Sequence, residues 1–209
     1  MDGSHYLSLN VVDMIEEKIY DKKNVVSFAK IAGEWGYFSN MYNSALFVNE
    51  TFIPSVEALY QSCKYPLFPN IQKEILSQNN AMKAKGISRK YYMFQRQDWE
   101  DVKFPIMRWC LMVKLIQNWD DLAPLLLKTK GFQIVEYSKK DAIWGAMPYG
   151  YDKLKGKNIL GRLLMDIRDK YVITNNKPKF IPPLQISSFQ LYGINIGRVY
   201  SAEYYEEDL

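Results

Sequence analysis

Histidine and cysteine are scarce in this sequence. The 209 residues include one histidine, His5, and two cysteines, Cys63 and Cys110. These residues provide no cluster with the ligand spacing of a zinc site, so neither a metal nor another cofactor is expected. Serine–histidine and cysteine–histidine catalysis are disfavoured for the same reason. Any catalysis must therefore use carboxylates, lysines, tyrosines or backbone amides.

Hydrophobic runs long enough to cross a membrane are absent as well. A membrane helix needs about 18 or more consecutive apolar residues, and no such run occurs. The first residues also lack the basic and apolar segments of a secretory signal. Cys63 and Cys110 lie in apolar, helix-like surroundings, which predicts buried, reduced thiols. We therefore expect a cytoplasmic protein without membrane contact.

The chain contains enough apolar material for a globular fold. Hydrophobic residues make up 48% of the sequence and charged residues 24%, and the length suits one domain with appendages. The net charge of +4 permits an anionic ligand without requiring one. Aromatic residues reach 15%, and they either fill a core or provide faces on which bases stack. Composition alone leaves both uses open.

Periodicity and chain breakers predict a mainly helical α+β domain with a small sheet. Strands are expected at Val25–Phe28 and Phe132–Tyr137, and a hairpin at 46–53. The expected helices are a short one through Val11–Ile19, one after Ser55, part of 71–94 with an end near Gly86, one capped by Asp98 and kinked or restarted at Pro105, Asp120–Lys130, and one after Asn158. The expected organisation is a lead-in at 1–24, a core domain at 25–171 and an appendage with an acidic end at 172–209.

The helix after Ser55 carries an unusual polar stripe. Apolar residues at helical spacing form one face, and Glu57, Gln61 and Lys64 form a second stripe beside it. Polar side chains at the rim of a core can line a pocket wall, but a solvated flank gives the same pattern more often. The spacing makes Glu57 and Lys64 candidates without deciding between a pocket and a surface.

A second unusual stretch, residues 136–151, contains Asp141 and Trp144 among glycines and a proline. Gly156 and Lys157 then precede a helix start, where exposed amides and the helix dipole can bind a phosphate. Many helices begin with glycine and lysine and bind nothing. This second signal is therefore weak in isolation.

In this order, the segments resemble the NADAR family (NAD- and ADP-ribose-associated proteins). The resemblance covers about residues 25–171. Its motifs are G-Y-F-S-N-M-Y at 36–42, F-I-P-S-V-E-A-L-Y-Q-S-C-K-Y at 52–65, A-M-K-A-K-G at 81–86, R-Q-D-W at 96–99, M-R-W-C-L-M-V-K-L-I-Q-N at 107–118, I-V-E-Y-S-K-K-D-A-I-W-G at 134–145 and G-K-N-I-L-G-R-L-L-M at 156–165. Each motif is common on its own, but all of them in register over most of the chain are specific.

The resemblance implies an α+β domain that cleaves an N-glycosidic bond to a ribose. Some members of the family act on phosphorylated intermediates of riboflavin synthesis. Others remove ADP-ribose from guanine bases, in some cases as antitoxins paired with a DNA ADP-ribosyltransferase toxin. The segment V-V-S-F-A-K-I-A-G-E-W-G at 25–36 is more similar to the second group. A non-catalytic ADP-ribose-binding module is a further alternative, against which the joint presence of Glu57, Lys64 and Asp141 argues.

For this chemistry, the resemblance makes Glu57 the candidate catalytic carboxylate. A carboxylate stabilises an oxocarbenium-like transition state, positions water, or acts as acid and base. Lys64 either neutralises a phosphate of the ligand or, if burial lowers its pKa, attacks an opened ribose as an amine. Asp141 is the second catalytic candidate, positioning ribose hydroxyls or water.

Binding roles are expected of a further set of residues. Trp144 and Trp35 are expected to stack on a base or to close the pocket, and Arg96 is an alternative phosphate contact. The predicted ligand-binding residues are Trp35, Ser39, Asn40, Arg96, Trp144, Gly145, Gly156, Lys157 and Asn158. The expected partners are ADP-ribosylated guanine in DNA or in a nucleotide and, for an antitoxin, an ADP-ribosyltransferase toxin.

Overall fold

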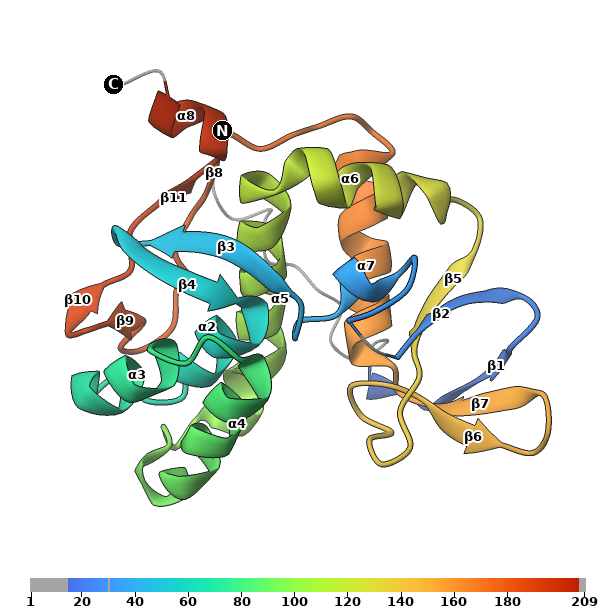
Figure 1. The fold of residues 1–209 in the computed structure, drawn as a ribbon, viewed down its shortest axis with the longest axis horizontal. Coiled ribbons are helices and arrows are strands. Elements are labelled where there is room, and N and C mark those ends of the chain that lie inside the picture. Colours follow the sequence, from blue (N-terminus) through green and yellow to red (C-terminus); the bar gives the residue numbers. More distant parts are fainter. Residues whose placement is uncertain (1–14, 30, 207–209) are drawn as a thin grey trace. The chain divides into compact units, whose positions relative to one another are not determined.

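The computed structural model describes residues 15–29 and 31–206 as a mixture of helices and small sheets (Figure 1). The predicted α+β fold class is therefore confirmed. The chain packs as two compact units, each built from two separate segments. The first unit comprises Met1–Ser39 and Asp120–Lys177, and the second comprises Asn40–Trp119 and Pro178–Leu209.

The first unit combines short strands with two helices. Its elements are β1 (Lys18–Asp21), β2 (Val25–Phe28), a 3-10 turn (Gly36–Phe38), α6 (Trp119–Lys128), β5 (Gln133–Glu136), β6 (Met147–Tyr149), β7 (Lys153–Gly156), α7 (Ile159–Ile167) and a π-helical turn (Arg168–Val172). β7 lies between β1 and β6 and is antiparallel to both, whereas β2 and β5 pair in parallel (Figure 1). The buried face of α7 packs against β5, which places the core of this unit between them.

The beginning of the first unit differs from the sequence expectation. His5 and the first part of the helix expected at Val11–Ile19 lie outside the described residues. The end of that segment is strand, because Lys18 and Ile19 pair with residues of β7. An isolated periodicity over a few residues could not reveal this pairing, since its partner lies more than a hundred residues further along the chain.

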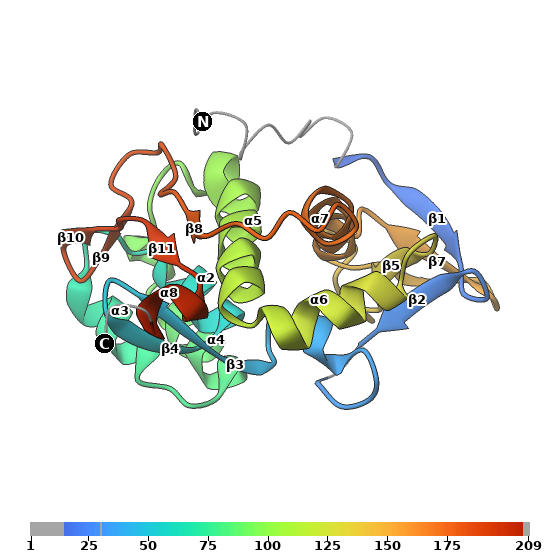
Figure 2. The same cartoon turned by 90° about the horizontal axis from the view of Figure 1, so that it is seen from above.

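The second unit is organised around the long helix α5. Its elements are β3 (Asn43–Val48), β4 (Thr51–Ser55), α2 (Val56–Ser62), α3 (Pro69–Leu76), α4 (Ala81–Lys90), a 3-10 turn (Tyr92–Phe94), α5 (Trp99–Gln117), β8 (Phe180–Ile181), β9 (Gln190–Leu191), β10 (Ile194–Asn195), β11 (Val199–Tyr200) and α8 (Ala202–Glu206). α5 contacts α2, β3, β8 and β11 (Figure 2). The segment after Pro178 is part of this unit's packing: the Trp109 indole donates a hydrogen bond to the Pro182 carbonyl at 2.9 Å.

Local signals account for the hairpin and for the start of α2. Asn49 and Glu50 both have positive φ angles, 48° and 59°, as the two central residues of a type I′ turn require. The Ser55 hydroxyl accepts a hydrogen bond from the Ala58 amide at 3.2 Å, so the predicted N-cap is confirmed. Together the turn and the N-cap fix the direction in which α2, with its polar stripe, follows the hairpin.

Two predicted interruptions do not occur. α4 continues through Gly86 to Lys90, so the predicted end near Gly86 is wrong, and α5 is continuous through Pro105, so the helix does not restart there. Glycine costs an isolated helix about 1 kcal/mol and proline about 3 kcal/mol. Thirteen side chains of α5 are buried. Packing of that extent outweighs the local penalty, so the tertiary structure decides where these helices end.

The remaining expectations concern cysteines and membrane helices. Cys63 and Cys110 are buried free thiols, as predicted. Burial raises the pKa of the Cys110 thiol well above its usual range, which leaves it protonated and unreactive. Among the described residues, no helix combines the length and the apolar character required to span a bilayer.

Lys114 is an unusual component of the α5 core. Only 1% of its surface is exposed, and its Nζ lies 5.7 Å from the centre of the Tyr42 ring. Burial lowers the pKa of Lys114 to about 7. In the unfolded chain the pKa of a lysine is about 10.4. Between these two values the unfolded state binds a proton that the folded state does not, so folding stability must rise with pH.

We therefore expect Lys114→Met to increase the free energy of unfolding at pH 6 to 7 and to flatten its rise towards pH 10, because methionine fills a similar volume without a charge. Urea unfolding at several pH values measures both effects. Lys73→Met, at an exposed position of α3, is the matched control. An unchanged pH dependence in Lys114→Met would contradict the expectation.

Candidate active site

Glu57 is a buried carboxylate in the first turn of α2. It is 2% exposed. The Asn40 side chain donates a hydrogen bond to its Oε2 at 2.5 Å, and the Gln61 side chain donates one to its Oε1 at 2.9 Å. The Glu57 amide in turn donates to the Asn40 carbonyl at 2.8 Å. These contacts fix the carboxylate in one orientation.

The polar stripe on α2 is not a solvated flank. All seven residues of α2 are buried. A buried ionised carboxylate is stable only with hydrogen-bond donors or a counter-charge around it. Asn40 and Gln61 are two such donors, and both lie in the second unit with Glu57. The sequence predicted Glu57 and Asn40 as site residues, and the structure brings them into direct contact.

A group of cations surrounds this carboxylate. The Lys85 Nζ lies 3.6 Å from the Glu57 Oε1, and the Lys85 side chain is 33% exposed. Lys64 and Arg89 complete the group, since the charges of Glu57, Lys85 and Arg89, and more weakly that of Glu100 outside the group, all act on Lys64. We call Glu57, Lys64, Lys85 and Arg89 the charged cluster. It contains three cations and one anion.

Lys64 is the titratable member of the charged cluster. Burial lowers the pKa of Lys64 to about 8; the Glu57 carboxylate opposes this shift, and the positive charges of Lys85 and Arg89 add to it. The Lys64 Nζ lies 5.0 Å from the centre of the Trp99 ring. With that pKa, about a tenth of the molecules carry a neutral amine at pH 7. Lysine thereby becomes a usable nucleophile or base.

Sequence reasoning missed Lys85 and Arg89. The two residues lie four positions apart on α4, which places them on one face of the helix, and α4 packs against α2. The spacing was a possible signal, but it did not reveal that this face is directed at Glu57. A charged helix face is usually a solvated surface, so only the contact with α2 distinguishes this one.

In the first unit, Asp141 organises the loop that carries Trp144. The Asp141 Oδ1 accepts hydrogen bonds from the amides of Ile143 and Trp144, both at 2.9 Å. Trp144 is half-buried. Trp35 lies in a different loop, directly before the 3-10 turn Gly36–Phe38, and stacks on Phe38 with ring centres 5.5 Å apart. Asp141 therefore has a structural task, and its catalytic role stays a prediction.

The predicted amide cradle at the start of α7 is wrong. The amides of residues 157–160 donate hydrogen bonds to the carbonyls of residues 142–145. The Asn158 side chain is also engaged, because it donates to the Ile134 carbonyl and accepts from the Glu136 amide. No amide of residues 157–160 is therefore left for a phosphate at this helix start. Contacts of a ligand with the half-buried Lys157 side chain stay a prediction.

Gly145 and Gly156 are explained by close backbone packing. A Cβ atom on Gly145 would lie 2.5 Å from the Glu136 carbonyl oxygen. A Cβ atom on Gly156 would lie 2.5 Å from the Gly145 carbonyl oxygen. Both distances are below any normal contact, so these positions exclude larger residues whatever the ligand. Ser39, also in the first unit, is buried in a tight turn, and its amide donates to the Gly36 carbonyl.

Arg96 belongs to the second unit, where it anchors the start of α5. Its Nε and Nη2 atoms donate to the Asp98 carboxylate at 2.5 and 2.8 Å, and Nη2 also donates to the Ser187 carbonyl. Because the Asp98 carboxylate is engaged in this way, its side chain does not cap α5 as predicted. The phosphate contact suggested for Arg96 stays a prediction.

The charged cluster provides the components of metal-free acid–base and nucleophilic chemistry. Glu57 provides a fixed carboxylate, and Lys64 provides an amine with a lowered pKa. Within residues 15–29 and 31–206, no group of three or more histidine, cysteine, aspartate or glutamate side chains is arranged to bind a metal ion. The excess positive charge suits an anionic ligand.

The chain is similar to known proteins. The model of the NADAR domain matches residues 27–171. The chain is 32% identical over 195 residues to the riboflavin biosynthesis protein VVA0006 of Vibrio vulnificus, covering 90% of this chain and 51% of that protein, so it spans about half of that relative's length. It is 33% identical over 149 residues to the N-glycosidase YbiA of Escherichia coli, covering 71% of this chain and 89% of YbiA.

The comparison extends to a solved structure. The NMR structure of E. coli YbiA matches with a TM-score of 0.64 and 30% identity, covering 76% of this chain and 91% of YbiA. A third relative, the N-glycosidase Npun_R5314 of Nostoc punctiforme, is 30% identical over 151 residues and is covered over 91% of its length. The motifs, the fold and these relatives agree: this chain belongs to the NADAR domain family.

Proposed function

We propose that this chain removes ADP-ribose from guanine bases of nucleic acid by hydrolysing the N-glycosyl bond to the ribose. The observation that supports it best is the charged cluster, in which Lys85 pairs with the buried Glu57 carboxylate and the charges of Glu57, Lys85 and Arg89 all act on Lys64. Removal of a toxin's modification from DNA is one setting for such a reaction. An ADP-ribosyltransferase toxin would then be its partner.

The enzyme class is the general part of this proposal, and the substrate is the specific part. YbiA and Npun_R5314 are both named N-glycosidases, and this chain covers 89% and 91% of their lengths. The predicted class, a hydrolase of N-glycosyl bonds, is therefore confirmed. Burial of the Glu57 carboxylate costs stability through desolvation, and a catalytic role is a reason to retain it, which favours an enzyme over a purely binding module.

The charge balance favours a ligand with more than one phosphate. Each cation of the charged cluster can neutralise part of a phosphate group, and Glu57 offsets only one of them. Lys85 and Arg89 are partly or fully exposed, so they can reach a ligand from solvent. The diphosphate of ADP-ribose matches such an arrangement better than a single phosphate does.

In the reaction, the bond between C1 of the ribose and the base nitrogen breaks. The departing base takes a proton, and the hydroxyl of a water molecule is joined to C1. We assign to the Glu57 carboxylate the stabilisation of the positive charge that develops on the ribose, or acceptance of the proton of the attacking water. In the alternative route, the neutral Lys64 amine attacks C1 of the opened ribose, the bond from C1 to the base breaks, and the base leaves with a proton. Water then hydrolyses the resulting imine, which releases the sugar aldehyde and restores the Lys64 amine.

A second candidate function is cleavage of a phosphorylated intermediate of riboflavin synthesis. It is supported by the names of two relatives, the Vibrio protein and the riboflavin biosynthesis protein PYRR of Zea mays, which is 31% identical over 165 residues. This chain covers 51% and 26% of these proteins. Such a substrate needs only one phosphate contact, so it leaves part of the charged cluster unused.

Hydrolysis of a guanine-ADP-ribosylated DNA oligonucleotide tests the proposal directly. We expect release of free ADP-ribose and of intact oligonucleotide, measured by chromatography and mass spectrometry. The phosphorylated riboflavin intermediate is assayed in parallel with the same enzyme preparation. Turnover of the intermediate without any release of ADP-ribose would favour the second candidate over the first.

We expect Glu57→Gln to reduce the hydrolysis rate at least about a hundredfold, the usual contribution of one acid–base group, because an amide cannot accept a proton or offset a cation. Circular dichroism and the melting temperature report on the fold. Asp101→Asn, at an exposed carboxylate of α5 that is not among the charges acting on Lys64, is the matched control and should retain activity. Activity of Glu57→Gln at the parent rate would rule out the catalytic assignment.

The two roles of Lys64 predict opposite pH profiles. If the neutral amine reacts, the rate rises as pH increases through about 8, and Lys64→Arg loses at least about a hundredfold because arginine stays charged. If Lys64 only neutralises phosphate, the rate falls above that pH and Lys64→Arg retains most activity. The lowered pKa of Lys64 makes us expect the first pattern, and steady-state rates between pH 6 and 9.5 distinguish the two.

A further inference from the structure

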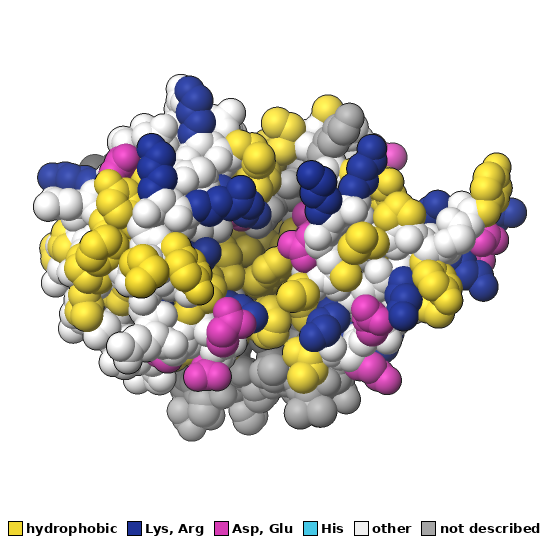
Figure 3. Space-filling view, turned by 90° about the horizontal axis from the view of Figure 1, so that it is seen from below, with side chains coloured by type: hydrophobic (Ala, Val, Ile, Leu, Met, Phe, Trp, Pro, Cys, Tyr) yellow, Lys and Arg dark blue, Asp and Glu magenta, His cyan; other side chains and the backbone are white. Residues whose placement is uncertain are grey.

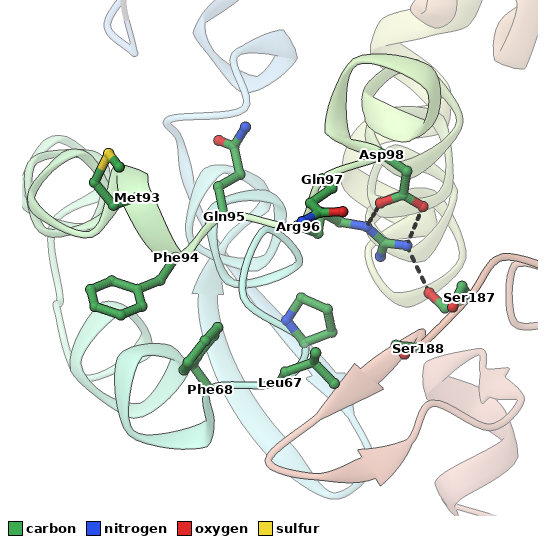
Figure 4. A pocket seen from close by; sticks show the side chains of 11 residues that line it. Leu67, Phe68, Met93, Phe94, Gln95, Arg96, Gln97, Asp98, Ser187 and Ser188 are labelled. Atoms are coloured by element: carbon green, nitrogen blue, oxygen red, sulfur yellow. Dashed lines mark hydrogen bonds and ion pairs between the residues drawn. The ribbon is translucent and has the colours of Figure 1, made fainter.

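The second unit contains a pocket of about 660 Å³ that the charged cluster does not use. It lies between the end of α2, the 3-10 turn Tyr92–Phe94 and the segment at Ser187 (Figure 4). Its volume is within the range of about 300–1,000 Å³ that is typical of small-molecule sites. One end of the pocket is aromatic and apolar, and the other end is polar.

The apolar end is formed by exposed side chains from two turns. The Phe68 and Phe94 rings meet edge to face, with centres 5.3 Å apart, and they are 37% and 49% exposed. Leu67 and Met93 beside them are 67% and 86% exposed. Figure 3 shows hydrophobic side chains gathered on the face of the second unit that carries α3 and α4. Contiguous exposed apolar groups mark binding surfaces.

The polar end contains a buried donor without an acceptor. The Arg96 side chain is 6% exposed, and two of its nitrogens bond to Asp98 and Ser187 (Figure 4). Its third nitrogen, Nη1, has no hydrogen-bond partner among the described residues. A buried guanidinium N–H left unpaired destabilises the fold, because it has lost its hydrogen bonds to water without replacing them. A ligand that presents an acceptor to Nη1 would recover this cost.

The charge at the polar end selects the kind of acceptor. The hydrogen bond from Arg96 lowers the pKa of the Asp98 carboxyl, so Asp98 stays ionised and neutralises the guanidinium. A free phosphate gains little at a site whose charge is already balanced. A carbonyl oxygen on a flat ring satisfies both ends: the oxygen accepts from Nη1 and the ring stacks on phenylalanine. An unpaired nucleobase has this chemistry.

The pocket is also directly linked to the catalytic helix. The Arg96 amide donates a hydrogen bond to the Lys64 carbonyl at 2.8 Å. Pro66 and Leu67, which follow Lys64 almost immediately, line the pocket wall. We propose that this pocket binds an unpaired base of the same nucleic-acid strand that carries the ADP-ribosylated guanine. This inference rests on the proposed function only in taking the substrate to be a nucleic acid.

Binding of unmodified, fluorescently labelled single-stranded DNA, measured by anisotropy, tests the pocket without requiring catalysis. We expect Phe94→Ala to weaken binding at least about fivefold, the lower end of the effect of removing a stacking aromatic ring. Phe94→Trp should restore affinity. Tyr92→Ala is the matched control, because Tyr92 is an exposed aromatic residue of the same turn, 68% exposed, that does not line the pocket.

Equal affinities of the parent and Phe94→Ala would overturn the inference, and so would a parent that binds no single-stranded DNA or prefers a duplex.

A second readout compares hydrolysis of an ADP-ribosylated guanosine mononucleotide with that of an oligonucleotide. Phe94→Ala should raise KM for the oligonucleotide alone. If the parent cleaves neither substrate yet binds DNA through Phe94, the proposed function fails and the pocket stands. If it cleaves both and Phe94→Ala changes nothing, the pocket fails alone.

Discussion

The burial of the Glu57 carboxylate is the constraint on which the rest of the second unit depends. A negative charge in a packed interior must be hydrogen-bonded and balanced, or the group takes up a proton. Asn40 and Gln61 satisfy its two oxygens, and Lys85 lies close enough to balance its charge. The loop before β3, the helix α2 and the helix α4 are therefore tied to one chemical group. The need to satisfy the Glu57 carboxylate explains why a buried helix carries a polar stripe.

The same cations have two consequences for chemistry. Lys85 and Arg89 add to the effect of burial in lowering the pKa of Lys64, and so increase the fraction of neutral amine. In the proposed function they are also the side chains that attract a phosphate-bearing ligand. A bound diphosphate would cancel part of their charge and raise the pKa of Lys64 again. Substrate binding and the protonation state of the amine are thereby coupled, as linkage requires.

The first unit shows how a helix start can lose its affinity for anions. The amides at the beginning of α7 are attractive to phosphate in principle, yet the carbonyls of residues 142–145 already accept their hydrogen bonds. The glycines on either side, Gly145 and Gly156, permit this close approach of two backbone segments. The loop with Asp141 and Trp144 is consequently a rigid support, built from backbone pairing.

Local patterns in the sequence determined several features of this protein. The N-cap at Ser55, the two-residue turn at Asn49 and Glu50, and the stripe with Glu57 and Gln61 all follow from dihedral preferences and helical periodicity. Lys64 lies just beyond the end of α2, at Ser62. The order of the motifs predicted the family. These are properties of contiguous residues, and short-range geometry is sufficient to express them.

Only the tertiary structure decided where the polar groups find their partners. It brings Lys85 to Glu57 and Arg89 near Lys64, and it occupies the amides at the start of α7. It also keeps α5 helical through Pro105 and leaves one nitrogen of Arg96 unpaired in a pocket whose other end is aromatic. Each of these outcomes depends on segments that are distant in the chain. The physical reason is that the energy of a buried charge or hydrogen bond is set by what surrounds it in space, and the local sequence does not contain that information.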